Sequence, residues 1–540
     1  MKKVGLIVAF CAIIVSLWAM PARRGGVVIT QPDGNQITVY QHGDEYFHWQ
    51  TNEKGEWMRL DTEGFYRVTE ALSDEAIQSM RFASPRRAEY KETPLNIAPR
   101  GLVILVNFQD VAFTTSTAEM DSMLTGYNYT RNYSYKYSKK NYNITSQGSA
   151  RQYFYDSSNG QYNPQFDVVG PVTISKEMSY YGENNSYGKD KRPGIMVVEA
   201  CKLVDNSVDF SLYDNDKDGV MDFVYVIYAG YGEADGGGDN TIWPHAWYLY
   251  SAAGKRCEVD GKVVDLYACG NEMDNYTEHH TGIGTFCHEF SHVLGLPDLY
   301  ETTGYGAHKT FGEWSILDYG PYNNDGNTPP MYSAYERFFM GWLIPELIVD
   351  SANIVLEELN SSQHALLISE TDQHNLIGND PNPANFYLLE NRQKEGWDEY
   401  LPGHGLMITH VQYNYNSWLQ NTVNNSSNRM GVDLIEADGK KPSSSSNGYT
   451  GKAGDLFPAG ATEYLGITNH SIEDVSEQDG IIYFKYRGGI ATSTEQVQTE
   501  ETIVAIYNIL GQKQAAVDIE SLPHGTYVVV TTAGSKKIVR

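Results

Sequence analysis

The sequence predicts an α+β protein, in which one helix-bearing domain is flanked by segments rich in β-strands. Residues 286–294 have the apolar spacing of an amphipathic helix, whereas residues 101–108 form a continuous apolar run typical of a buried strand. Beyond about residue 346, short alternating strands are separated by Gly, Pro and Asn turns. With 540 residues, the chain is long enough for three or four such units.

The composition is that of a globular protein with material for a large core, since 41% of residues are apolar and 20% are charged. The formal net charge is −28, from 40 basic and 68 acidic residues. This balance argues against nucleic acid or an anionic membrane as a partner.

The first residues predict export. Met1-Lys2-Lys3 precedes a short apolar run from Val4 to Ala19, so residues 1–22 are predicted to be a secretory signal peptide. The alternative is a membrane anchor, but the run is short for a span and Arg23-Arg24 follows it. We expect no transmembrane segment in the mature chain, because no later stretch is long and apolar enough.

Residues 23–97 are predicted to be a β-rich pro-segment, with strands at 27–29 and 36–39 and a polar, basic junction near 84–87. Such a segment would keep the domain that follows inactive until the segment is removed. It contains no Cys, which excludes a thiolate as the blocking group. A carboxylate or the new amino terminus could block the site instead.

The strongest chemical signal is the H-E-x-x-H stretch from His288 to His292. The two imidazoles are one helical turn apart on one face, so they can bind one Zn²⁺, with Glu289 beside them as a base for a metal-bound water. Gly295 can end the helix at positive φ and return Asp298 to the metal. Two surface histidines are the alternative, but the following Gly and Asp favour zinc.

The third zinc ligand is less certain from the residues alone. Asp298 has the favoured spacing, six residues after the second His. Glu301, three residues later, and Glu336, on a following helix, are rivals because a distant helical Glu completes many zinc sites. Measuring bound zinc after replacing each in turn would decide between them.

A second metal site is predicted upstream. Asp214, Asp216, Asp218 and Asp222 surround a Gly in the pattern D-x-D-x-D-G, which is typical of an oxygen cage for Ca²⁺. The twelfth-position Glu of a full EF-hand is missing. An acidic turn before the strand at 223–228 is the alternative.

The remainder of the central region, residues 98–345, predicts helices at 149–155 and 194–204 and a strand at 166–169. Elsewhere between 127 and 181 the chain is rich in Tyr, Asn and Ser with poor periodicity, and we expect loops. Four cysteines follow the signal peptide, which permits two disulfides. Cys257 and Cys269 are the nearer pair, and Cys287 is expected to be a buried thiol.

The pattern from His288 to Tyr300, followed by Trp314-Ser315-Ile316-Leu317, resembles the immune-inhibitor-A-like family of secreted metallopeptidases, a metzincin-related group. The resemblance implies a zincin/metzincin-like catalytic domain. Leu317 stands where the family has Met in a packing turn beneath the zinc, a mild apolar change. Tyr319 matches a tyrosine that assists the transition state in related metzincins; ordinary packing is its alternative role. The resemblance extends over further blocks, about residues 25 to 488.

Residues 346–488 are predicted to form a β-sandwich-like accessory domain. From about 489 the composition becomes linker-like. The blocks 506–513 and 522–530 and the basic end 536–540 then resemble the C-terminal sorting domain of type IX secretion cargo. That resemblance implies a Gram-negative envelope, the type IX machinery as a partner, and a secreted or cell-surface location.

Together these features predict a secreted zinc endopeptidase acting on proteins or peptides. Two other classes stay open. One is a non-catalytic surface-binding protein on the same scaffold, against which Glu289 argues because a structural zinc needs no base. The other is a zinc hydrolase of another ester or amide. Cleavage of casein or gelatin that a zinc chelator blocks would separate the three.

Overall fold

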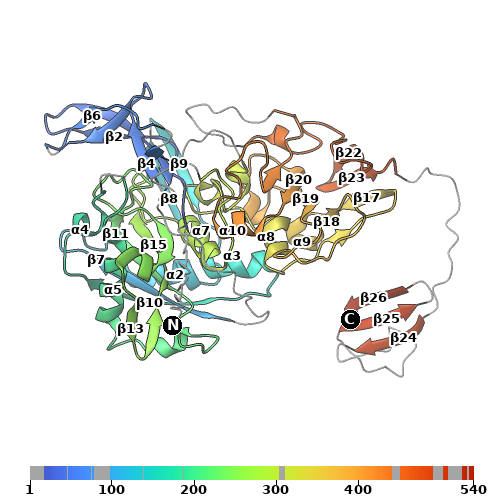
Figure 1. Cartoon of the computed structure of the whole chain (residues 1–540), viewed down its shortest axis with the longest axis horizontal. Coiled ribbons are helices and arrows are strands. Elements are labelled where there is room, and N and C mark those ends of the chain that lie inside the picture. Colours follow the sequence, from blue (N-terminus) through green and yellow to red (C-terminus); the bar gives the residue numbers. More distant parts are fainter. Residues whose placement is uncertain are drawn as a thin grey trace, which may run out of the picture. The chain divides into compact units, whose positions relative to one another are not determined.

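The computed structural model describes residues 18–44, 47–61, 63–73, 76–77, 98–137, 139–185, 188–302, 310–440, 451–489, 503–508, 526–531 and 534–539. The chain divides into two compact units, Met1–Gly489 and Ile490–Arg540 (Figure 1). Most of the predicted signal peptide and the basic junction near 84–87 lie outside the described residues.

A six-stranded mixed sheet forms the centre of the first unit, in the order β1-β12-β15-β11-β7-β10. The neighbours β15, β11, β7 and β10 run parallel, whereas β12 and β1 are added antiparallel at one edge. The strands are β1 (Trp18–Ala19), β7 (Arg100–Asn107), β10 (Gln165–Thr173), β11 (Val224–Tyr231), β12 (His245–Tyr248) and β15 (Leu266–Met273).

A hydrophobic core covers each face of this sheet, and the side chains of β7 alternate between the two cores. Val103 and Leu105 belong to the core that includes residues of α3 and α7, whereas Leu102 and Ile104 belong to the core that includes residues of α5. Alternate side chains thus face opposite layers, as strand geometry requires. The helices of this region are α2 (Thr117–Thr125), α3 (Ala150–Ser157), α4 (Met178–Gly182), α5 (Pro193–Val204), α6 (Leu249–Ala253), α7 (Gly284–Val293) and α8 (Ala334–Phe339).

The expectation of loops across the tyrosine-rich stretch is wrong for residues 132–145. There β8 (Asn132–Tyr137) and β9 (Lys140–Thr145) pair as an antiparallel hairpin. Tyr135 and Tyr142 lie opposite each other and their rings stack, with centroids 5.0 Å apart. Cross-strand aromatic pairs of this kind stabilise a hairpin. A second short hairpin joins β13 (Cys257–Val259) to β14 (Lys262–Val264).

The predicted pro-segment contains a five-stranded antiparallel sheet in sequence order, which includes the strands expected at 27–29 and 36–39. Its strands are β2 (Gly26–Thr30), β3 (Gln36–Asp44), β4 (Phe47–Thr51), β5 (Trp57–Leu60) and β6 (Tyr66–Val68). Stacked rings of Trp49 and Trp57, 5.4 Å apart, join β4 to β5.

Two further sheets, with a common hydrophobic core, follow the catalytic region. The first has the order β16-β18-β19-β20-β21, and the second has the order β17-β23-β22. Their bounds are β16 (Glu346–Leu347), β17 (Ala352–Leu356), β18 (Leu366–Ile368), β19 (Asn385–Arg392), β20 (Gly405–Gln412), β21 (Val432–Leu434), β22 (Ile472–Gln478) and β23 (Ile481–Tyr486). Two short helices, α9 (Leu359–Ser362) and α10 (Tyr415–Leu419), lie in their connections.

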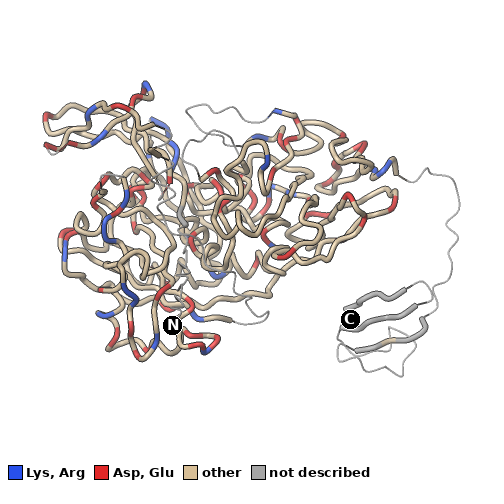
Figure 2. Tube along the Cα trace, viewed as in Figure 1, with Lys and Arg blue, Asp and Glu red and all other residues tan. Residues whose placement is uncertain are grey.

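The second unit contains a three-stranded antiparallel sheet, formed by β24 (Ile503–Asn508), β25 (Thr526–Thr531) and β26 (Gly534–Val539), with β25 in the middle. Among the described residues, no helix has the length and apolar character needed to cross a bilayer. Acidic and basic residues are interspersed along the described chain (Figure 2).

Candidate active site

Helix α7 carries the H-E-x-x-H motif and is anchored by its apolar side. Phe290 packs against the rings of Phe154 and Phe223, with centroids 4.9 and 4.8 Å away. The helix ends as predicted, because Gly295 has φ +100°, a conformation that favours glycine. Its start packs closely on another loop: a Cβ on Gly284 would lie 1.9 Å from the carbonyl oxygen of Pro321.

The two histidines of α7 are fully enclosed and point their Nε2 atoms toward each other, 3.0 Å apart. The Nδ1 of His288 lies 2.7 Å from the carbonyl oxygen of Ile316, and the Nδ1 of His292 lies 3.0 Å from that of Leu296. A carbonyl accepts a hydrogen bond only from a protonated Nδ1, so each ring has its Nε2 lone pair available for a metal. Burial lowers the pKa of His292 to about 4, which keeps that ring neutral.

Asp298 completes the group. Its Oδ1 lies 3.4 Å from the Nε2 of His288 and 3.2 Å from that of His292. Burial alone would raise the pKa of Asp298, but the two imidazoles outweigh burial and lower it to about 2. No residue that the structure describes donates a hydrogen bond to this buried Oδ1. Two imidazole nitrogens and one carboxylate oxygen converging without such a donor fit a divalent cation such as zinc.

A residue of the β-rich region fixes the Asp298 side chain. Asn421 Nδ2 donates to Asp298 Oδ2 at 2.5 Å, and Asn421 Oδ1 accepts from the Asp298 backbone N–H at 2.8 Å. Both residues are buried. The sequence analysis missed Asn421, which is 123 residues away and belongs to no motif.

Glu336 and Glu301, the alternative third ligands, do not belong to the metal-binding cluster found among the described residues. Glu336 lies at the start of α8 in a capping box with Ser333, and its Oε1 also accepts from the Ser315 hydroxyl at 2.7 Å. Glu301 is buried nearby but contributes no atom to the cluster.

Glu289 is buried beside the histidines, and its pKa is raised well above the ordinary value by burial and by the negative charge of Asp298. Its Oε1 accepts a hydrogen bond from the backbone N–H of Met20 at 3.1 Å. The other oxygen, Oε2, has no hydrogen-bond partner among the described residues. One oxygen of the carboxyl group is therefore available to exchange a proton with a bound molecule.

The turn that follows the motif orients His288 and packs in the core beneath the helix. Ile316 supplies the carbonyl that orients His288, and Leu317 is fully buried where the sequence pattern predicts a packing residue. Tyr319 follows in the same turn, and the guanidinium of Arg24 lies over its ring, 3.6 Å from the centroid. Burial raises the pKa of Tyr319.

The segment around residues 18–24 lies against Glu289 and Tyr319, which sequence reasoning did not anticipate. Trp18–Ala19 pairs antiparallel with β12 at the sheet edge. The next carbonyls are then held by side chains: Trp243 Nε1 donates to Met20 O at 3.0 Å, and the Tyr322 hydroxyl donates to Pro21 O at 2.7 Å. The sequence analysis used Arg23-Arg24 only as the flank of a signal peptide.

The predicted calcium loop brings Asp214, Asp216 and Asp218 together, with Gly219 at φ +91° in the sharp turn. Asp222 lies outside this group, and its Oδ2 accepts from Asn215 instead, through the backbone N–H at 2.9 Å and through Nδ2 at 2.6 Å. The Lys262 ammonium also donates to Asp214 Oδ2 at 2.6 Å.

The cysteines are partnered differently from the nearest pair in sequence. Cys257 interacts with Cys201, and this contact is the largest cause of a raised pKa for Cys201 and a lowered pKa for Cys257. Cys269 instead lies 3.5 Å from His245 Nδ1. All four described cysteines are free, and Cys287 is buried as expected.

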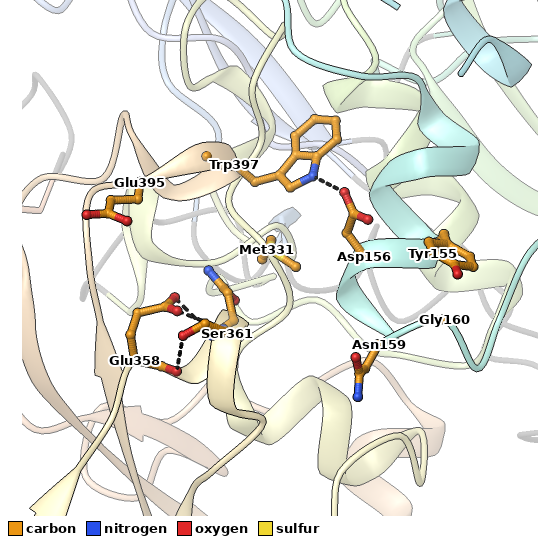
Figure 3. Close-up of a pocket in the computed structure, with 11 residues that line it drawn as sticks. Tyr155, Asp156, Asn159, Gly160, Met331, Glu358, Ser361, Glu395 and Trp397 are labelled. Carbon is orange, nitrogen blue, oxygen red and sulfur yellow. Dashed lines mark hydrogen bonds between the residues drawn. The ribbon is translucent and has the colours of Figure 1, made fainter. Parts of the chain in front are cut away.

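A separate cavity of about 440 Å³ lies between the catalytic and β-rich regions (Figure 3). Asp156 of α3 accepts a hydrogen bond there from Trp397 Nε1 at 2.9 Å. Neither the two histidines of α7 nor Asp298 lines this cavity, so it is distinct from the candidate active site.

A helix with paired imidazoles, an adjacent carboxyl group and a looped-back aspartate, packed on one face of a mixed sheet, is an arrangement typical of zinc metallopeptidases. Residues 95–343 match the family model described as the immune inhibitor A peptidase M6, catalytic domain. This match confirms the resemblance predicted from the sequence for the catalytic region.

Named relatives agree with this class. Immune inhibitor A of Bacillus thuringiensis subsp. alesti is 29% identical over 237 residues, which is 39% of this chain and 34% of the relative. The pre-pro-metalloprotease PrtV of Vibrio cholerae serotype O1 (strain M66-2) is 25% identical over 247 residues, or 41% of this chain and 27% of the relative. The similarity thus covers about a third or less of these relatives.

Proposed function

We propose that this chain is a secreted, zinc-dependent endopeptidase that hydrolyses peptide bonds of extracellular proteins. The observation that carries the proposal is the convergence of His288, His292 and Asp298 next to the buried carboxyl group of Glu289. The family match over residues 95–343 supports the same reaction class.

The roles of the residues follow from their positions. His288, His292 and Asp298 would hold zinc, which when bound supplies Lewis acidity and lowers the pKa of a coordinated water to about 7. Glu289 accepts a proton from the attacking water and later delivers it to the leaving nitrogen. Tyr319 would hydrogen-bond the negatively charged oxygen of the transition state once Arg24 has left its ring.

Glu289→Gln tests the assignment, because it preserves size and removes the base. We expect zinc to stay bound and cleavage of casein to be abolished. Full activity of this variant would refute the assignment. If the unmodified chain binds zinc and a partner protein but cleaves no substrate, the non-catalytic surface-binding alternative is supported instead. Glu336→Gln and Glu301→Gln are the matched variants for the ligand set, and both should retain bound zinc.

We further propose that residues 23–97 act as a pro-segment. Support comes from Met20, Arg23 and Arg24, which lie against Glu289 and Tyr319 where substrate would bind. Signal-peptide cleavage at Ala19 would leave the amino group of Met20 beside Glu289, whereas cleavage at Ala22 would remove it. Amino-terminal sequencing of the latent form distinguishes these two origins, and a processed chain no more active than its precursor would refute latency.

Calcium binding at Asp214, Asp216 and Asp218, with Asp222 as the fourth predicted ligand, is also a proposal. The clustered carboxylates support it, while the Lys262 ammonium competes for Asp214. Loss of thermal stability on chelation that calcium restores and zinc does not would support the site. An unchanged melting temperature would count against it.

Export through the type IX machinery is proposed from the C-terminal sequence blocks. The three-stranded sheet of the second unit is compatible with a small sorting domain. Deleting residues 503–540 should retain the protein inside the envelope of a type IX-competent host. Unimpaired release to the medium would refute this role.

A further inference from the structure

Arg23 occupies a cradle built entirely by the catalytic region. Its guanidinium forms a close ion pair with Asp274 through Nη1 and contacts Asp325 Oδ1 through Nη2 at 2.7 Å. The rings of Tyr276 and Tyr322 flank it, with centroids 4.4 and 5.8 Å from Cζ. Paired carboxylates and aromatic faces together are a recognition site for a guanidinium group.

The cradle has a defined position relative to the reacting bond. Glu289 delivers its proton to the leaving nitrogen, and the nitrogen beside its Oε1 is that of Met20. Met20 therefore takes the place of the first residue on the leaving-group side, and Arg23 takes that of the fourth. Trp243 Nε1 and the Tyr322 hydroxyl donate to the carbonyls of Met20 and Pro21, so the segment from Met20 onwards is held along its backbone as a bound peptide would be.

The carboxylates are organised independently of Arg23. Asp274 Oδ1 accepts from the backbone N–H groups of Tyr276 and Thr277, at 2.7 and 3.1 Å. Asp325 Oδ2 accepts from the Tyr135 hydroxyl at 2.5 Å. These contacts do not involve Arg23, so the protein itself orients both carboxylates beside the two rings. Two oriented carboxylates that have lost their ion-pair partner attract a new cationic side chain.

We propose that Asp274, Asp325, Tyr276 and Tyr322 form a substrate subsite for Arg or Lys at the fourth position on the leaving-group side. This inference rests on the proposed peptidase function and names the class of sequence that the cleft selects. The competing explanation is that these four residues bind only Arg23 of the pro-segment and no substrate side chain. The test separates the two explanations.

The first arm uses the full chain and needs no activity. Hydrogen exchange of the backbone around residues 20–30 is compared in Arg23→Gln and in Arg67→Gln, an exposed arginine of the same segment that pairs with Asp61. We expect exchange at least about tenfold faster in the first variant, the effect of losing charged hydrogen bonds, and no change in the second. Equal hydrogen-exchange rates in the two variants would show that the contacts of Arg23 do not hold the segment, which would overturn the proposal.

The second arm uses the processed enzyme released by secretion, with fluorogenic peptides that differ only at the fourth position. We expect kcat/KM to be at least about tenfold higher with Arg than with Gln. Asp325→Asn should reduce this preference, measured as the ratio of kcat/KM for the Arg and Gln peptides. Asp474→Asn, at an exposed position on β22, should leave the ratio unchanged. Equal kcat/KM for both peptides would refute the substrate subsite and would mean that these residues bind only Arg23 of the pro-segment. If no peptide is cleaved, the proposed function fails, whatever the first arm gives.

Discussion

The hydrogen bonds from Asn421 to Asp298 predict that the β-rich region controls metal affinity. Asn421 has φ +49°, so Asn421→Gly removes the side chain without the strain that Ala would add. The substitution deletes the 2.5 Å bond to Oδ2 and the 2.8 Å bond from the Asp298 backbone. Loss of such a supporting contact weakens metal binding about 10- to 100-fold, which corresponds to about 1.4–2.8 kcal/mol.

Competition with a chromophoric zinc chelator at neutral pH measures this change directly. Asn424→Gly is the matched control, because Asn424 is buried in the same loop and its amide donates to the carbonyls of Leu299 and Val432. Both variants should lose stability, whereas only Asn421→Gly should lose zinc affinity. Equal zinc affinity in the two variants, or an undiminished affinity in Asn421→Gly, would refute the idea that Asn421 positions the ligand.

Docking of the pro-segment should weaken as pH rises. Burial alone would lower the pKa of His48, but Glu233 at 3.0 Å and then Asp190 outweigh it and raise the pKa to about 9; Asp239 also acts on this ring. Relative to the ordinary pKa of 6.5, the raised pKa stabilises the docked segment by on the order of 3 kcal/mol. This stabilisation is fully present below pH 6.5 and is lost as the pH rises through 9. Exchange rates in β4 should rise over that window, and His48→Gln should remove the dependence. Phe290→Ala should cost about 3–5 kcal/mol by emptying an aromatic core site, measurable by urea unfolding; a loss below 1 kcal/mol would contradict this packing.

Local chemistry explains why the helix that carries the H-E-x-x-H motif could be predicted from the sequence. The spacing of His288 and His292 fixes their common face, and Gly295 and Asp298 are close enough in sequence for one turn to bring them together. The hairpin at 132–145 carries a usable signal too, since tyrosines alternate at 133, 135 and 137. Polar neighbours and the absence of aliphatic residues in that first strand obscured it.

Contacts between distant segments could not be predicted in this way. Asn421 lies in a polar stretch without a motif, and its pairing with Asp298 depends on how the β-rich region packs on the catalytic region. Met20 lies 269 residues from Glu289, so only the folded sheet edge brings them together. The same limit applies to Cys201 and Cys257, which meet through α5 and β13 rather than through sequence proximity.

The proposed latency and the proposed specificity depend on the same contacts. Glu289 accepts the backbone N–H of Met20, Trp243 and Tyr322 donate to the carbonyls of Met20 and Pro21, and two carboxylates bind the side chain of Arg23. A substrate needs the same three elements: an extended backbone, a nitrogen beside the acid–base carboxyl group, and a group that compensates buried negative charge. On this proposal both ligands use one set of groups, so stronger recognition of a basic substrate also strengthens recognition of the uncleaved segment. The tethered segment would have the higher effective concentration, and we therefore expect it to exclude substrate until the tether is cut.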